Sequence, residues 1–249
     1  MLVLLAAAAL SAPAAALAAS PAAATALDPA AKKAALKLAR ILYTEESQLR
    51  MAGRMIDETI APALRKDENF AALELDYPGI TNAMIAEMRP LLEGYVREAL
   101  PDYYDRVAAL LGSKLTAAEI DDLAGFYLSP TGRKLLKGVH ENYRGEAMID
   151  EVLADPDAPT SYSAMSKDHR AAVGEAVKLI DNSDTDALIA LGKKPYAARL
   201  RALGPEMRKL DQDFTNAPAP EFERRVEDTL VLAMERFMAA ADSRRSGKE

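Results

Sequence analysis

A tight corner between two helices is the strongest local constraint on how this chain can fold. Thr116 suits the N-cap of a helix, and Glu119, three residues later, completes a capping box. The apolar residues that follow recur at the spacing of one helix face, namely Ile120, Leu123, Ala124 and Tyr127. The stretch from Leu115 onward therefore predicts an amphipathic helix.

Ser129-Pro130 ends this helix near Leu128 and begins a second one. Ser129 can cap the second helix, and Pro130 suits its first position, where no amide hydrogen is needed. Gly132 lies in the first turn, where a missing side chain lets another backbone approach closely. The apolar face continues, so the second helix is expected to run to about Leu153.

The motif in this run is a helix ending in Phe-Tyr, a Ser-Pro-x-Gly corner and a Lys-bearing second helix, carried here by Phe126, Tyr127, Ser129, Pro130, Gly132 and Lys134. In this it resembles the bacterial envelope family catalogued as domain of unknown function 2059. The resemblance is centred on about residues 90–145. It implies an all-helical domain, usually exported, with no established activity and no catalytic residues to carry over.

Composition supports a helical class. Hydrophobic residues make up 50% of the 249-residue chain, but many of them are alanine and there is no Trp. Alanine favours helix and offers little area to bury. We therefore predict an all-α fold, a multi-helix bundle of kinked amphipathic helices with a tight helix-Ser-Pro-x-Gly-helix corner. Residues 66–79 are expected to be a connection. A kink or a new helix start is expected at Pro90, a helix start at Pro101 and a helix end at Gly112.

The ends of the chain and a Pro-rich stretch define the expected domain organisation. Residues 1–27 carry no charged side chain, and residues 1–19 have the apolar run and small-residue site of a signal peptide. A retained membrane anchor and a cytosolic Ala-rich tail are the alternatives. A helical domain is expected over 28–154, a linker over 155–163, a C-terminal helical region over 164–242 and a disordered tail over 243–249.

Charge and residue usage argue against several functional classes. A net charge of −7 disfavours a nucleic-acid partner. The chain has no Cys and only two His, with no metal-binding or cofactor-binding motif around them, so no metal and no cofactor are expected. The acidic run 181–186 lacks the central Gly and closing Glu of a calcium loop, which favours a helix end followed by an N-cap at Asp184.

The corner is the one place where the sequence indicates a candidate ligand site. Free amides at the helix N-terminus, a glycine and two cations can hold a phosphate or carboxylate, and the residues are Ser129, Gly132, Arg133 and Lys134. The alternative interpretation is a satisfied cap with two solvated basic residues.

No catalytic residues are assigned. The favoured hypothesis is an exported, periplasmic, non-catalytic binding or interaction domain for an envelope protein or an apolar ligand. Self-association is left open, and membrane contact is expected only through an uncleaved N-terminus. The alternative is a periplasmic hydrolase-like enzyme with residues assembled from distant Tyr, His and Asp positions. A cleft that brings together Tyr127, Tyr143, His140 and a carboxylate would favour it.

Overall fold

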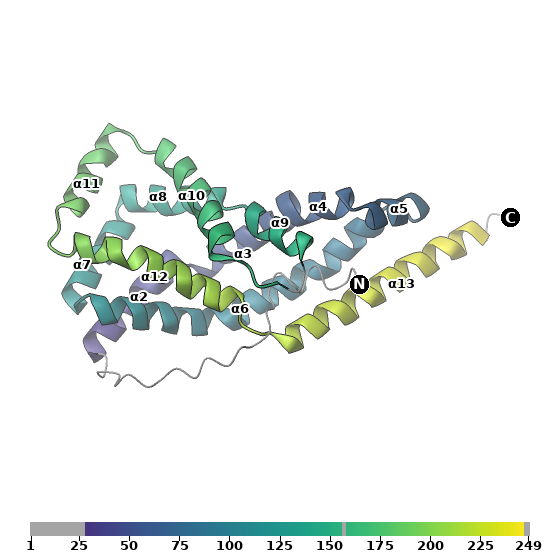
Figure 1. Cartoon of the computed structure of the whole chain (residues 1–249), viewed down its shortest axis with the longest axis horizontal. Helices are drawn as coiled ribbons and strands as arrows, with labels where there is room; N and C mark the ends of the chain where they lie inside the picture. The colour runs from purple at the N-terminus through teal and green to yellow at the C-terminus, as the bar shows by residue number, and fades with distance from the viewer. Residues whose placement is uncertain (1–27, 156–157, 247–249) are drawn as a thin grey trace.

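The computed structural model describes residues 28–155 and 158–246, and every regular element in these ranges is helical (Figure 1). The all-α prediction is confirmed. The first elements are α2 (Pro29–Leu42), α3 (Glu45–Met55), the π-helical turn η1 (Ile56–Ile60), α4 (Ala61–Lys66) and α5 (Glu68–Asp76). The middle ones are α6 (Ile80–Lys114), α7 (Ala117–Leu128), α8 (Pro130–Asn142) and α9 (Glu146–Ala154). The last are α10 (Tyr162–Lys178), α11 (Asn182–Gly192), α12 (Ala197–Thr215) and α13 (Pro220–Ser246).

The long helix α6 is the element around which the others pack. It runs unbroken for 35 residues through both Pro90 and Pro101, so the expected helix start at Pro101 and end at Gly112 are wrong. An interior proline costs a helix roughly 3 kcal/mol because it removes a hydrogen bond and crowds the preceding turn. Here both halves of α6 are buried in hydrophobic clusters, and this packing holds the helix together across the prolines.

Two hydrophobic clusters share α6. The first joins the C-terminal half of α6 to α2, α7 and α12, and includes Val107, Leu38, Ile120 and Leu203. The second joins the N-terminal half to η1, α5 and α13, and includes Ile80, Ile56, Phe70 and Val226. Both clusters therefore draw residues from either side of the 155–163 linker. In Figure 1, α13 lies along α6 and carries the chain to its C-terminal end.

Three segments differ from the sequence-based expectation. Residues 68–76 form α5, since Asp67 accepts hydrogen bonds from the amides of Asn69 and Phe70 and the Phe70 ring is buried. The expected single helix to Leu153 divides into α8 and α9 at Gly145. The φ of this residue is 68°, in the left-handed region that favours glycine. Disorder after Asp242 is wrong for 243–246, which continue α13, and 247–249 lie outside the described residues.

Candidate ligand-binding site

The α7–α8 corner has the predicted local geometry. The Thr116 hydroxyl accepts from the Glu119 amide at 3.4 Å, and the Glu119 carboxylate accepts from the Thr116 amide at 2.9 Å. The Ser129 hydroxyl accepts from the Gly132 amide at 3.2 Å, which caps α8. A Cβ on Gly132 would lie 2.1 Å from the carbonyl oxygen of Phe126, so only glycine fits this turn.

The Lys134 ammonium at the corner is held by two carboxylates of the α11 N-terminus. It donates to Asp181 at 2.8 Å and to Asp184, whose side chain is only 5% exposed. The Thr131 hydroxyl also donates to Asp184, at 2.7 Å. The ammonium of Lys134, followed by the Thr131 hydroxyl, lowers the pKa of the Asp184 carboxyl, and the two carboxylates raise the pKa of Lys134.

The four residues of the predicted anion site therefore do not converge on a shared space. Ser129 and Gly132 bond each other, Lys134 reaches the α11 cap, and Arg133 is exposed with no ion pair in the described part of the chain. An anion at this corner competes with Asp181 and Asp184 for the ammonium. The arrangement matches the structural alternative, and anion binding at the corner stays a prediction. Asp181 caps α11 in place of the expected Asp184, which occupies the third position of a capping box.

A different place, on α2, has the features of a ligand site. One face of α2 packs against α6 and α7 and is made of four alanines and one leucine, namely Ala31, Ala34, Ala35, Leu38 and Ala39. Alanines along this face let the helices approach closely. The opposite face carries long side chains at helical spacing, of which the cations are exposed while Leu36 and Ile41 are half-buried against the core.

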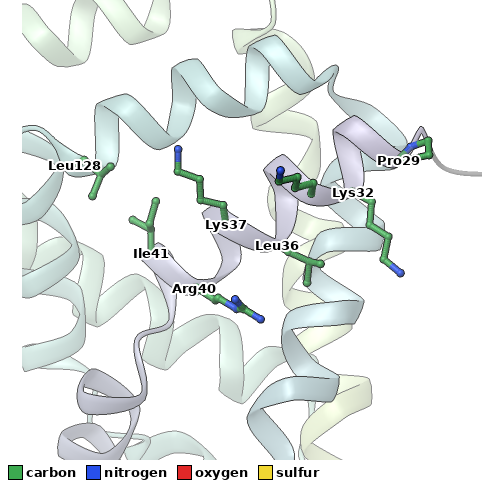
Figure 2. Close-up of a pocket in the computed structure, with 8 residues that line it drawn as sticks. Pro29, Lys32, Leu36, Lys37, Arg40, Ile41 and Leu128 are labelled. Carbon is green, nitrogen blue, oxygen red and sulfur yellow. The ribbon is translucent and has the colours of Figure 1, made fainter.

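This outer face lines an open groove of about 710 Å³ between α2 and the end of α7 (Figure 2). Its apolar part comes from Pro29, Leu36, Ile41 and Leu128, and its basic part from Lys32, Lys33, Lys37 and Arg40. In Figure 2, Leu128 of α7 stands opposite Ile41, and the charged side chains extend away from the α2 ribbon. Leu128 is 47% exposed and immediately precedes the corner residue Ser129, so the groove ends beside the corner.

The charge of the groove is largely uncompensated. Over the described residues, Lys32, Lys33 and Arg40 form no ion pair, and Lys37 reaches Asp121 only at 3.9 Å between two exposed side chains. Helix α2 contains no acidic residue, although the chain as a whole is acidic. A cationic rim on an apolar floor suits a ligand that combines an anionic group with an apolar part. The lining offers no carboxylate, imidazole or hydroxyl for acid–base chemistry.

The residues named for a hydrolase do not line this groove. Burial raises the pKa of Tyr127 and of Tyr143, and the Tyr143 hydroxyl lies 3.1 Å from the Met148 sulfur. Burial, with the charges of Arg50 and Arg54, lowers the pKa of His140. No three His, Asp or Glu side chains come together as metal ligands within the described ranges.

Sequence reasoning missed the α2 groove and one interior polar contact. The Tyr103 hydroxyl donates to Asp211 at 2.5 Å, and burial raises the pKa of the Asp211 carboxyl to about 6. The signal for the contact is that Asp211 lies on the helix face of Met207 and Phe214. The signal for the groove is a set of four cations, without an acid, on one helix of an acidic chain.

The fold and the groove together define an all-helical protein with a basic, apolar-floored surface site. Residues 104–139 match the family model described as "Uncharacterized protein conserved in bacteria (DUF2059)". This segment covers the C-terminal part of α6, α7 and most of α8, and it confirms the resemblance inferred from the corner motif. No curated protein and no solved structure matches the chain.

Proposed function

We propose that this protein is an exported, non-catalytic binding domain of the bacterial envelope, and that the α2 groove is its ligand site. The observation that carries the proposal is the groove itself, where four cations border an apolar floor of the half-buried Leu36 and Ile41 and the exposed Leu128. Its ligand has an anionic group for the rim and an apolar part for Leu36, Ile41 and Leu128. The lining contains no carboxylate, imidazole or hydroxyl, and its lysines are exposed to solvent, which supports binding over hydrolysis.

A pair of matched variants tests the site. The groove variant replaces Lys32, Lys33, Lys37 and Arg40 with Gln. The control variant makes the same change at four exposed cations elsewhere, Lys167, Lys178, Lys209 and Arg224. The two variants have the same net charge, so only the location of the lost charge differs. Because exposed charges contribute within about half a kcal/mol to stability, both variants are expected to fold.

Isothermal titration with dodecyl phosphate, kept below its micelle concentration, measures the binding. The parent and the control variant are expected to bind, and the groove variant is expected to bind at least about tenfold more weakly, which corresponds to 1.4 kcal/mol. Dodecyl maltoside, which has the same chain and no charge, is the comparison ligand. Equal affinity of the two variants for dodecyl phosphate contradicts the assignment of the site.

Export is tested separately. The apolar, uncharged residues 1–19 support secretion, and this segment lies outside the described residues. After expression and periplasmic fractionation, the intact mass is expected to correspond to a chain beginning at or near Ala19 or Ser20. A soluble cytosolic species that retains Met1 contradicts export.

A further inference from the structure

The outer face of α2 is continuous along the whole helix. Its members recur every three or four residues from Pro29 to Ile41, so they form one straight stripe. The opposite face is buried against α6 and α7, which fixes the stripe in one orientation on a rigid part of the fold. The stripe is a preformed surface and needs no ordering of the backbone to meet a partner.

The stripe combines cations with a few apolar side chains. Apolar side chains alternate along it with lysines and an arginine, whose aliphatic stems lie along an apolar surface while their charges extend outward. The four cations lie within about two and a half turns of one helix with no acidic residue among them, so their charges add at the surface. Over the described residues, the one ion pair that these cations form joins Lys37 to Asp121 at 3.9 Å.

The open shape of the groove decides between kinds of anionic ligand. A soluble amphiphile laid in it would keep one side of its apolar chain in water, because none of the described residues covers the groove from above. A phospholipid in a bilayer has its chains already buried, and it needs from the protein only cations at headgroup height and a few apolar side chains at the interface. Leu128, which is 47% exposed, stands beside the half-buried Ile41 at one end of the stripe, where it can enter that interface (Figure 2).

We infer that the outer face of α2 docks on the surface of a bilayer that contains anionic phospholipid. This inference rests on the proposed function and specifies the ligand of the same site. No helix in the described residues is long and apolar enough to cross a bilayer, and the inferred contact lies along the surface. Each basic residue close to an anionic membrane strengthens binding roughly fivefold, and salt screens the attraction.

Vesicle flotation of the full chain tests the inference. The vesicles contain either phosphatidylcholine alone or equal parts of phosphatidylcholine and phosphatidylglycerol. In low salt, the parent and the control variant are expected to float with the anionic vesicles. The fraction of the groove variant that floats is expected to be at least about tenfold smaller. Neutral vesicles measure any binding through the apolar N-terminus, which the three proteins share. Raising the salt to about 0.5 M is expected to release the parent from the anionic vesicles.

A second variant keeps the charges and changes the apolar end of the stripe. Leu128→Gln is tolerated because the side chain is 47% exposed, and it is expected to weaken flotation with anionic vesicles. Melting curves of each variant establish that it is folded.

The outcomes separate the inference from the proposed function. If dodecyl phosphate binds in the groove but the parent does not prefer anionic vesicles, the membrane inference is overturned and the proposed function stands. If the groove variant floats as well as the control variant, the inference is also overturned. If neither the amphiphile nor the vesicles bind, both fail. Binding of soluble polyglutamate in place of vesicles would assign the groove to an acidic polypeptide and overturn the inference.

Discussion

At the scale of single residues, Gly132 shows how closely the corner is packed. A Cβ there would lie 2.1 Å from the Phe126 oxygen and 2.5 Å from the Tyr127 Cα, both of which are backbone atoms. A flexible side chain can move aside, but backbone cannot do so without opening the turn. At Gly125, in the preceding helix, an added Cβ would meet no atom of another part of the fold within 4 Å. The two glycines therefore provide a matched comparison.

We expect Gly132→Ala to lower the free energy of unfolding by about 1–3 kcal/mol, the usual cost of forcing extra volume into a packed site. Gly125→Ala is expected to raise it by about 0.5–1 kcal/mol, because alanine is the better helix former. Urea denaturation of both variants measures the difference. A Gly132→Ala protein as stable as the parent would show that the corner is looser than described.

Asp211 makes the stability of the protein depend on pH. Burial raises the pKa of its carboxyl from 3.8 to about 6, while the Tyr103 hydrogen bond and Arg208 lower it by less. The folded state therefore holds this proton more tightly than the unfolded state does. Stability from this group is present below about pH 4 and is lost as the pH rises through about 6.

Asp211→Asn, which imitates the protonated form, is expected to remove this loss. Since one pKa unit corresponds to about 1.4 kcal/mol, the variant should gain up to about 3 kcal/mol over the parent between pH 4 and pH 7. Denaturation at a series of pH values follows the difference between the two proteins. A constant difference across this range would contradict the raised pKa.

At the scale of secondary-structure elements, the N-terminus of α8 is joined to that of α11. Asp184 receives bonds from the Thr131 hydroxyl, the Lys134 ammonium and the Asp181 amide. Its side chain is 5% exposed, so the loss of one donor leaves a buried carboxylate poorly balanced. Arg133, next in sequence to Lys134, has an exposed side chain outside this network.

Lys134→Gln is therefore expected to lower the melting temperature, while Arg133→Gln leaves it nearly unchanged. The pKa of Asp184 is lowered, so the network stabilises the fold above about pH 4 and its contribution is lost on acidification. The gap between the two melting temperatures should accordingly narrow in acid. Equal melting temperatures at neutral pH would mean that the Lys134 contact contributes nothing.

At the scale of the whole molecule, helices on either side of the 155–163 linker pack on one another. Helix α10 packs against α8, and both α12 and α13 pack against α6. Within the linker, the Thr160 amide donates to Asn216 at 3.0 Å and the Ser161 amide donates to Glu151 at 2.8 Å. Helix α10 also begins inside the predicted linker, at Tyr162. The boundary between two units remains a prediction for proteolysis.

Limited proteolysis is expected to cut first within about residues 155–163 and to yield two resistant pieces. Because α6 contributes to both hydrophobic clusters, the pieces should remain together under native conditions. Size-exclusion chromatography of the nicked protein, followed by denaturing electrophoresis, examines both points. Cuts confined to the termini would indicate that no separable boundary exists.

The sequence alone determined the helical class and the corner. Both depend on local chemistry, because caps such as Thr116 and Ser129 bond amides only three residues away. The family resemblance rests on the same local motif. These features hold whichever helices pack around them.

Tertiary packing decided the rest. Pro90 and Pro101 signal breaks locally, yet burial of both halves of α6 outweighs that signal. The exposed charge of Lys134 was expected to face solvent or an anion, and it meets carboxylates 47 and 50 residues away. The cations of α2 form a candidate site because packing buries the alanine face of the helix and places Leu128 of α7 at one end of the groove. Contacts between distant residues depend on how the helices pack, and no local pattern in the sequence specifies that arrangement.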